Sequence, residues 1–460
     1  MFDALGIISR VDEANDPTRS LQVWLAQREG KDTQGLPGDL NVILKTVPAA
    51  SRTPEQQKKL RDYFLADVCA TTKPVLAPIQ AEIARLKKER EDFDNAIPAS
   101  FVMRDLPTPR ESFVMLRGAY DKPGDKVDRA VPAAFPPLQN AQTPNRLDLA
   151  RWLVADNHPL TARVTVNRFW QQFFGVGLVK TSADFGSQGE PPSHPELLDW
   201  MAVSFRESGW DVKKLVRTFV TSATFRQSSS APAELWKRDP ENRLHARGTR
   251  LRLDAEEVRD NVLAVSGLLD PTMGGKGVRP YQPPNIWEPV GFTGSNTANY
   301  KQDTGSALYR RSIYTFLKRT APAPFLANFD APSREQACTM RERSNTPMQA
   351  LQLMNDVQHV EAARAFAERI MTTGGATPEE RIAFAYRSTL SRKPAPEEIA
   401  IVRGALEHHL AAYRQAADAA AKFIRQGESK PNPGLPEPEL AAWTLVANLV
   451  LNLDETITRN

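Results

Sequence analysis

Cysteine and histidine are scarce in this chain, which has two and six of them in 460 residues. Two cysteines, Cys69 and Cys338, cannot build a disulfide framework, and a single bridge between them is left open. The sequence contains no Cys-x-x-Cys-His motif, so we expect this chain to attach no c-type haem of its own. The histidines lack the His-x-x-x-His and Glu-paired helical spacings of metal ligands, so we expect no metal site.

Long apolar runs are missing as well. The longest one, at 441–453, has 13 residues and is too short to cross a bilayer. We therefore predict no transmembrane segment. The first residues, MFDALGIISR, lack a basic start, an apolar stretch and a small-residue cleavage site, so we expect no signal peptide in this chain.

No charge of one sign dominates, because the formal net charge is only +4. This weak positive balance argues against a nucleic-acid partner. Recognisable catalytic templates are also missing: the sequence has no phosphate-binding loop, dinucleotide fingerprint or Gly-x-Ser-x-Gly elbow. The kinase-like letters ADFG at 183–186 stand without the other kinase motifs, so we interpret them as a chance match.

Arginine and proline are abundant. The chain has 40 arginines against 19 lysines, and 36 of its residues are proline. Arginine suits bidentate contacts with carboxylate, sulfate or phosphate groups, although genome composition could also account for the excess. Frequent proline indicates long loops and abrupt helix starts.

Helix signals nevertheless dominate the sequence. Thr53, Pro54 and Gln56 form a capping-box pattern, and a second apolar seam runs from Leu76 to Leu86, which predicts an antiparallel helical hairpin over 53–94. Ser193, Asp211 and Asp254 are predicted N-caps, and Gly175 should end the helix before it. Further helices are expected at 144–155, 161–174, 346–371, 396–425 and 438–453, with another beginning at Thr377.

Strand signals are few. The repeated letters SFVM at 100–103 and 112–115 predict a β-hairpin or two strands of a small sheet, and the alternation at 308–318 predicts a strand. Long Gly/Pro-rich or irregular loops are expected at 270–305 and 320–345. The predicted fold class is therefore mainly α: a multi-helix domain with a small β component and long Gly/Pro-rich loops.

Several long motifs resemble one known family. They are TARVTVNRFWQQFFGVGLVKTSADFGSQGEPPSHPELLDW at the start of 161–229, RRSIYTFLKRTAPAPFLANFDAPSRE at 310–335, SNTPMQALQLMND at 344–356, and the ending AAWTLVANLVLNLDETITR. Together they resemble the planctomycete cytochrome-associated C-terminal domain, which is the domain of unknown function numbered 1553. The resemblance covers roughly 100–460, and 1–95 looks like the end of the companion domain that precedes it in longer members.

The resemblance implies a setting rather than a reaction. Members are typically exported bacterial proteins, and many come from bacteria rich in polysaccharide-degrading enzymes. It implies a periplasmic or extracellular location and c-type haem in longer family members. Possible partners are a c-type cytochrome domain or polysaccharide. The expected organisation is a companion-domain end with the helical hairpin at 1–95, a short β-hairpin and Pro-rich linker at 96–142, and a helical domain at 143–460.

The densest group of polar residues lies between 163 and 199, on a predicted helix, the loop after it and the next helix start. Arg163 and Asn167 are four residues apart and share a helix face. These side chains could bind an anion, or the loop carboxylates could fold back and pair with the arginines. The candidate anion site in this region comprises Arg163, Asn167, Arg168, Asp184, Glu190 and His194.

A second group flanks the predicted helix start at Thr346. It includes Asp330, Arg343 and Asn345, and arginines beside a helix N-terminus suit an anion. The alternative is that Thr346 simply caps the helix while the arginines pair with nearby carboxylates. We predict that this group and the first one face each other and line one pocket.

Four aromatic residues of the long loop form a third candidate site: Tyr281, Trp287, Phe292 and Tyr300. Aromatic rings on a loop can stack on sugars, or they can fix the loop to the helical core. Three functions therefore compete. The first is a non-catalytic interaction or scaffold domain, the second is an enzyme acting on polysaccharide or another anionic substrate, and the third is a glycan-binding module.

Overall fold

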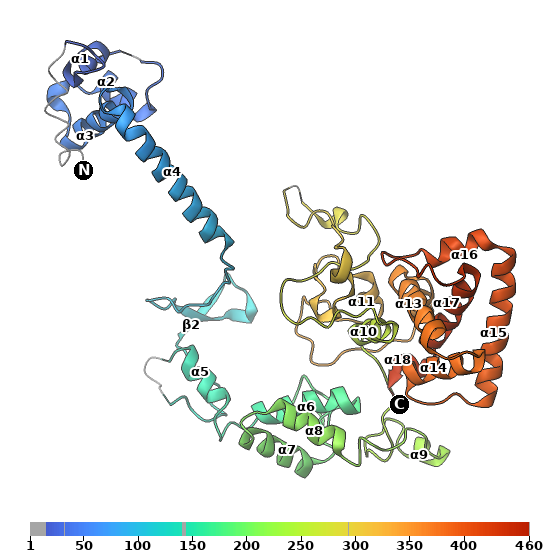
Figure 1. Ribbon diagram of the computed structural model, residues 1–460. Coiled ribbons are helices and arrows are strands. Elements are labelled where there is room, and N and C mark those ends of the chain that lie inside the picture. Colours follow the sequence, from blue (N-terminus) through green and yellow to red (C-terminus); the bar gives the residue numbers. More distant parts are fainter. Residues whose placement is uncertain (1–14, 32, 140–143, 293, 460) are drawn as a thin grey trace. The chain divides into compact units, whose positions relative to one another are not determined.

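The computed structural model describes residues 15–31, 33–139, 144–292 and 294–459 (Figure 1). These residues contain 18 α-helices and two small antiparallel sheets of two strands each. The predicted fold class, mainly α with a small β component, is therefore confirmed. The chain divides into two compact units, the first ending at Glu111 and the second beginning at Ser112. The N-terminal letters used for the signal-peptide prediction and the end of the predicted linker, 140–142, lie outside the described residues.

The first unit is a small helical assembly around Trp24 and Phe64, which are 1% and 0% exposed. Leu44, Leu60 and the free Cys69 also belong to this core. Its helices are α1 (Leu21–Arg28), α2 (Gly38–Thr46), α3 (Pro54–Tyr63) and α4 (Lys73–Ala96). The predicted capping box is confirmed, because Gln56 N–H donates to the Thr53 hydroxyl and the Gln56 side chain accepts from Thr53 N–H.

Helix α4 differs from the packed hairpin helix that its apolar seam predicts. Leu76 is buried, but Ile79, Ile83 and Leu86 are 50%, 45% and 50% exposed. The reason is a mismatch in length: α3 has 10 residues and continues into a π-helical turn at Phe64–Val68, whereas α4 has 24 residues. Most of α4 therefore has no counterpart in α3 against which to pack.

The second unit begins with a hairpin of β1 (Ser112–Met115) and β2 (Pro123–Val127). The hairpin expected between the two SFVM segments is wrong, because 100–103 forms no strand and β1 pairs with a segment that follows it. Gly118 has a φ of 75°, which suits a turn between β1 and β2. The connection RDLPTPRE contains two prolines and no glycine, and it offers no comparable turn.

A cluster of aromatic and aliphatic side chains follows. It is built from α6 (Thr161–Phe174), α7 (Pro195–Glu207) and α8 (Val212–Thr221), with α5 (Arg146–Leu153) before it and α9 (Ala233–Arg238) after it. Val166, Trp170, Phe205 and Phe219 are buried in its centre. Gly175 ends α6 as predicted, with a φ of 85°; a Cβ there would lie 2.7 Å from a Leu251 methyl group.

Two capping predictions near this cluster had different outcomes. Asp211 caps α8 as predicted, accepting a hydrogen bond from Lys214 N–H at 2.9 Å. The prediction that Ser193 caps α7 is wrong, because His194 occupies the N-cap position and Pro195 begins the helix. The Ser193 hydroxyl instead lies 3.0 Å from His194 Nδ1.

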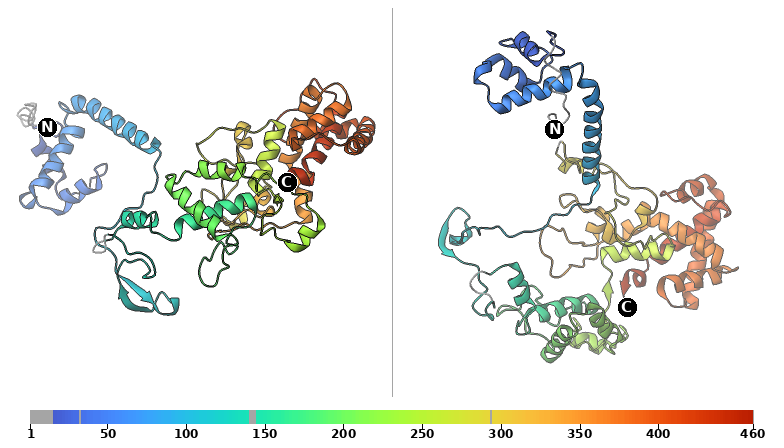
Figure 2. Two further views of the ribbon diagram at one scale, coloured as in Figure 1. Left: turned by 90° about the horizontal axis from the view of Figure 1, so that it is seen from below. Right: turned by 60° about the vertical axis from the view of Figure 1, so that its left-hand side comes forward.

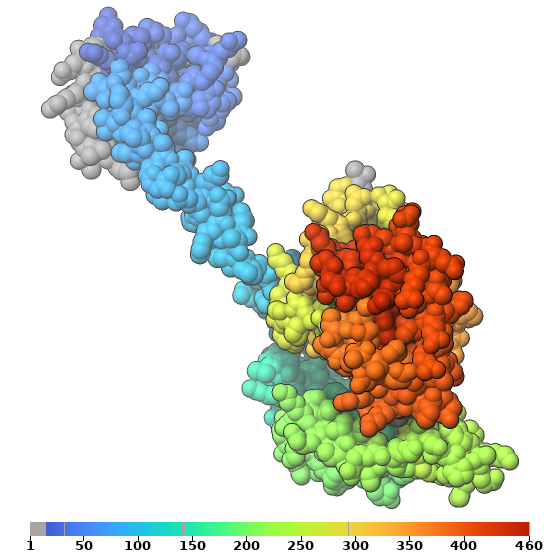
Figure 3. Space-filling view, turned by 45° about the vertical axis from the view of Figure 1, so that its right-hand side comes forward, coloured from blue at the N-terminus to red at the C-terminus, as the bar shows by residue number. Residues whose placement is uncertain are grey.

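The largest core lies among the C-terminal helices, which cluster in every view (Figures 1 and 2). Figure 3 shows them in orange to red as one close-packed mass. Phe366 and Val446 are both fully buried in this core, on α13 and α17. Its helices are α10 (Ala255–Ser266), α13 (Val357–Thr373), α14 (Pro378–Leu390), α15 (Pro396–Gln415), α16 (Ala417–Ile424) and α17 (Glu437–Leu451).

The short elements around this core bring distant segments together. Strand β3 (Leu251–Arg252) pairs with β4 (Thr458–Arg459), which follows α18 (Asp454–Ile457). Helices α11 (Pro324–Asn328) and α12 (Pro347–Asn355) flank α10 and α13. Within the described residues, no helix combines the length and apolar character needed to span a membrane.

The structure corrects three boundaries here. Residues 308–318 are not a strand but include 3-10 turns at Gly305–Tyr309 and Ser312–Tyr314, with only isolated bridges to Asp270 and Val278. The helix predicted over 346–371 breaks at Asp356, whose carboxylate accepts from Gln358 N–H and caps α13. The helix predicted over 396–425 breaks at Ala416.

Candidate functional site

The residues predicted on α6 have separate surroundings. Asn167 is fully buried, and its amide accepts from Val179 N–H at 2.9 Å and donates to the Val179 carbonyl at 3.0 Å. Arg163 donates to Asp199 Oδ1 at 2.6 Å and to the Pro159 carbonyl at 2.5 Å. Arg168 is exposed and makes no hydrogen bond or ion pair with the described residues. Asn167 therefore fixes the loop after α6, and Arg163 joins α6 to α7.

The other members of the first group are distributed along the following loop. Asp184 accepts from Gly186 N–H at 2.7 Å, and Glu190 is exposed. The His194 ring lies 5.6 Å from the ring of His245. Hydrogen bonding from Arg163 lowers the pKa of Asp199. These contacts hold the loop in place.

The second group is more compact. Asp330 accepts hydrogen bonds from Arg252 at 2.6 Å and from the Ser344 N–H and hydroxyl at 2.7 and 2.8 Å. Burial alone would raise the pKa of Asp330, but the Ser344 and Arg252 contacts lower it overall. Arg343 donates to the Arg252 carbonyl and to Asp254, whereas Asn345 is exposed.

The segments that carry the two groups come into contact, although the predicted residues themselves do not bond to one another. The loop after Asp330 does reach α6, because Gln171 donates to the Thr339 carbonyl at 2.6 Å. A cavity of about 300 Å³ lies beside this contact, between Gln172 and the loop that includes the exposed, free Cys338. Among the described residues, no hydrogen bond or ion pair joins a predicted member of one group to a predicted member of the other.

The loop aromatics turn largely toward the protein. Trp287 is only 1% exposed, and its ring meets Tyr300 edge-on at 4.9 Å. Tyr300 donates to the Pro280 carbonyl, and Tyr281 Oη accepts from Glu428 N–H at 2.7 Å. Burial raises the pKa of both tyrosines. Phe292, at 75% exposure, is the member of this set whose ring is open to solvent.

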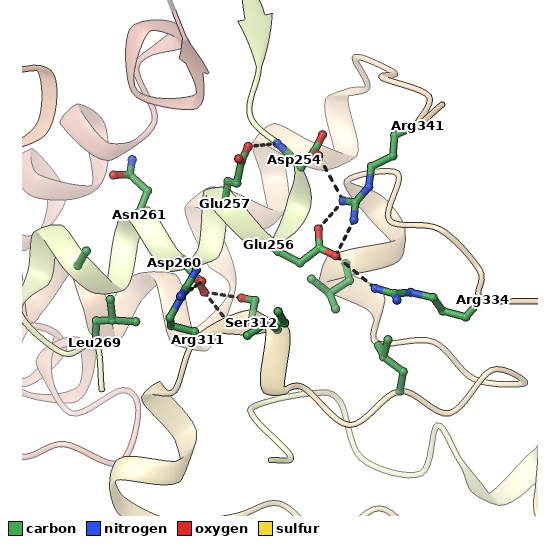
Figure 4. Close-up of a pocket in the computed structure, with 14 residues that line it drawn as sticks. Asp254, Glu256, Glu257, Asp260, Asn261, Leu269, Arg311, Ser312, Arg334 and Arg341 are labelled. Carbon is green, nitrogen blue, oxygen red and sulfur yellow. Dashed lines mark hydrogen bonds and ion pairs between the residues drawn. The ribbon is translucent and has the colours of Figure 1, made fainter. Parts of the chain in front are cut away.

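A larger cavity, of about 690 Å³, lies beside α10, and Asp254, which pairs with Arg343 of the second group, lines it (Figure 4). Glu256 and Asp260 are four residues apart on α10, so they share the face that lines the cavity. The opposite wall comes from the 311–341 segment. The lining residues are Asp254, Glu256, Glu257, Asp260, Asn261, Ala264, Leu269, Arg311, Ser312, Ile313, Leu317, Leu326, Arg334 and Arg341.

The carboxylates of this cavity already have strong donors. Arg341 donates two hydrogen bonds to Glu256, at 2.6 and 3.2 Å, and lies 3.4 Å from Asp254. Asp260 accepts from the Ser312 N–H and hydroxyl, both at 2.7 Å. Burial opposes the ionisation of Glu256, but the Arg341 hydrogen bonds and charge outweigh it and lower the pKa. Glu256 is therefore a carboxylate that stays ionised.

Two arginines of the cavity retain unused donors. Arg311 Nε is 3.7 Å from Asp260, and an Arg334 terminal nitrogen is 3.7 Å from Glu256. These distances exceed those of hydrogen bonds, and the two side chains are 47% and 51% exposed. The sequence analysis does not include α10 in a site, because it assigns Asp254 only the role of an N-cap. The available signal was the spacing of Glu256 and Asp260 on one helix face.

The sequence matches the family described as "Protein of unknown function (DUF1553)" over residues 145–406. The chain belongs to this family. The DUF1553 match includes the α10 cavity and all the predicted site residues, and it ends within α15. Helix α17 lies beyond the match, although it packs in the same core as α13. No curated protein and no solved structure matches the chain.

Within the part of the chain that the structure describes, no group of three or more His, Cys, Asp or Glu side chains is arranged to hold a metal ion. The DUF1553 region contains arginines that fix loops, cavities with polar and apolar lining, and exposed apolar surface on helices.

Proposed function

We propose that this chain is a non-catalytic interaction domain of an exported, cytochrome-linked bacterial protein of the planctomycete type. The observation that carries the proposal is an apolar stripe on α12. Met348, Leu351 and Met354 are 58%, 55% and 57% exposed, and their three-residue spacing places neighbouring members on one side of the helix. Exposed clusters of large apolar side chains, methionine among them, are typical of protein-binding surfaces.

The arginines of the candidate sites support a structural role rather than catalysis. Arg163 and Arg343 connect segments through carboxylates and backbone carbonyls, and Arg341 holds Glu256. A carboxyl group that acts as a general acid needs a raised pKa. Glu256 has a lowered one, so it is unsuited to protonate a leaving group. The enzyme interpretation therefore receives no support from the carboxylate that Arg341 holds.

A glycan-binding role is also less well supported. Sugar stacking requires an accessible aromatic face. Trp287 is buried between the loop and its neighbours, and the hydroxyls of Tyr281 and Tyr300 are used within the protein. Phe292 alone is a narrow basis for polysaccharide recognition.

A c-type cytochrome domain is the partner that we propose for the α12 stripe. The basis is the family resemblance, combined with the limited size of the stripe. Redox partners often associate through small interfaces, below roughly 1,200 Å² of total buried surface. A few exposed apolar side chains on one short helix suit a contact of this size.

The test is a binding titration between the full chain and a purified c-type cytochrome domain taken from a longer family member. Replacing Met348 and Leu351 together by serine should weaken binding at least about tenfold, because it removes apolar area from the contact. The melting temperature should stay nearly unchanged, since both side chains are exposed.

Ile401→Ser is the matched control. Ile401 is an exposed apolar residue on α15, at 69% exposure, and it lies outside the stripe. This variant should bind like the unmodified chain. Equal binding by the stripe variant would refute the role of α12, and absence of binding by every variant and by the unmodified chain would refute the cytochrome partner.

A further inference from the structure

The α10 cavity combines three features that a ligand could use together. It has a volume of about 690 Å³, an aliphatic wall and two arginines with free donors. Small-molecule sites typically occupy about 300–1,000 Å³ and combine apolar lining with a few converging polar groups. Ile313 adds a further feature, because it lines the cavity at 74% exposure and would be covered by a ligand.

Charged groups of both signs surround the cavity. Four carboxylates line it: Asp254, Glu256, Glu257 and Asp260. Five arginines lie among or directly behind them: Arg311, Arg334 and Arg341 in the lining, Arg343 at 3.3 Å from Asp254, and Arg259 at 3.7 Å from Asp260. The seven charged groups of the lining itself sum to −1, so an anion is held by the individual arginines that have free donors and not by the net charge.

Glu256 and Asp260 keep hydrogen-bond donors even when Arg311 and Arg334 are not paired with them. Glu256 keeps two hydrogen bonds from Arg341, and Asp260 keeps two from Ser312, when Arg311 and Arg334 turn to a ligand. Arginine binds a carboxylate through parallel N–H donors. An incoming anion would therefore gain charge-assisted hydrogen bonds without leaving a protein carboxylate unpaired.

We propose that the α10 cavity binds a small organic carboxylate with an aliphatic body. Arg311 and Arg334 hold the carboxylate, and Ile313, Leu317 and Leu326 contact the hydrocarbon part. This site is separate from the α12 stripe, so the inference does not depend on the proposed cytochrome contact.

The test is calorimetric titration of the full chain with octanoate, octylammonium and butyrate, all as dissolved monomers. Octanoate should bind with one site per chain. Octylammonium has the same hydrocarbon chain and the opposite charge, so it should not bind. Butyrate should bind more weakly, by about fourfold for each methylene that octanoate buries in addition.

Variants locate the ligand. Arg311→Gln and Arg334→Gln should each weaken octanoate binding at least tenfold, because each removes a guanidinium and retains a side chain of similar length. Arg319→Gln is the matched control: Arg319 also makes a single ion pair at 3.7 Å, is 63% exposed, and does not line the cavity. It should bind octanoate like the unmodified chain. Ile313→Ser should reduce the advantage of octanoate over butyrate.

The failures are equally specific. Binding of octylammonium as tight as that of octanoate would show that the hydrocarbon chain alone is recognised, and would overturn the proposal. Octanoate binding that survives both arginine substitutions would do the same. Acetyl-leucine, which imitates an apolar peptide C-terminus, separates the two sources of such a carboxylate. Tighter binding of acetyl-leucine than of octanoate would assign the cavity to a peptide terminus and refute the free acid.

Discussion

The surroundings of the His245 ring lead us to predict that the second unit loses stability in mild acid. Its ring lies 5.2 Å from Trp170, 5.8 Å from Phe174 and 5.6 Å from His194, measured between ring centres. Neither ring nitrogen has a hydrogen-bond partner among the residues that the structure describes. Burial, followed by the charges of His194 and Arg243, lowers the pKa of His245 from 6.5 to about 4.

The sign and size of the effect follow from this pKa. The unfolded chain takes up the proton near pH 6.5, and the folded chain resists it until about pH 4, so acid favours unfolding. A shift of 6.5 − 4 = 2.5 pKa units corresponds to at most about 3.4 kcal/mol. About 2 kcal/mol of this should be lost between pH 7 and pH 5. The stability contribution is therefore present above the unfolded pKa and is lost as the pH falls toward the folded one.

Urea unfolding of the full chain at a series of pH values measures this loss. His245 has a φ of 51°, a left-handed conformation that asparagine tolerates, so His245→Asn removes the titrating group with little backbone strain. The variant should show a smaller fall in unfolding free energy from pH 7 to pH 5, by about 2 kcal/mol. His408→Asn, at an exposed histidine of α15, should keep the full pH dependence.

Proton NMR of the six histidines gives an independent readout. The ring signal that disappears in His245→Asn should titrate near pH 4 in the folded protein. Titration of that signal near pH 6.5, together with parallel unfolding curves for the variant and the unmodified chain, would refute the reasoning.

Three further substitutions test the buried polar contacts. Arg341→Ala should lower the free energy of unfolding by about 2 kcal/mol, because it leaves the partly buried Glu256 and Asp254 without their arginine partner. Arg319→Ala, in the same thermal-unfolding assay, should cost less than about 0.5 kcal/mol. Asn167→Ala should cost about 2–3 kcal/mol in urea unfolding by leaving the N–H and carbonyl of Val179 without their amide partner. Tyr309, whose pKa burial raises to about 12, should contribute stability that is intact below pH 10 and lost by about pH 12; Tyr309→Phe should reduce this alkaline loss, and an unchanged alkaline unfolding curve would contradict it.

Local signals in the sequence predicted local structure well. The capping box at Thr53, the helix start at Thr377, the cap at Asp211 and the helix stop at Gly175 all occur as expected. Each depends on residues only a few positions apart, so the chain needs no distant partner to form it. The prediction that Ser193 is an N-cap was wrong because Pro195 occupies the first helical position and so places the N-cap at His194.

Strand prediction failed where the partner strand was missing. The alternation over 308–318 resembles a half-buried strand, yet the segment folds into 3-10 turns with two isolated bridges. Side-chain alternation does not supply the continuous row of hydrogen bonds that a sheet requires. In the loop at 270–305, composition could not distinguish the buried Trp287 from the exposed Phe292, since that difference arises from tertiary packing.

The arginines show why a site of charged residues is harder to predict than a helix. Arg341 pairs with Glu256 across 85 residues, and Arg252 pairs with Asp330 across 78. Arg334 and Arg341 belong to one loop, but Arg341 is committed to two hydrogen bonds with Glu256, whereas Arg334 approaches the same carboxylate only to 3.7 Å. The capacity to bind a ligand therefore belongs to the arginine whose partner is already satisfied by another donor. Whether an arginine is free in this sense depends on which donor lies closest to a carboxylate in the folded protein. Neither the number of arginines in a segment nor their spacing predicts it.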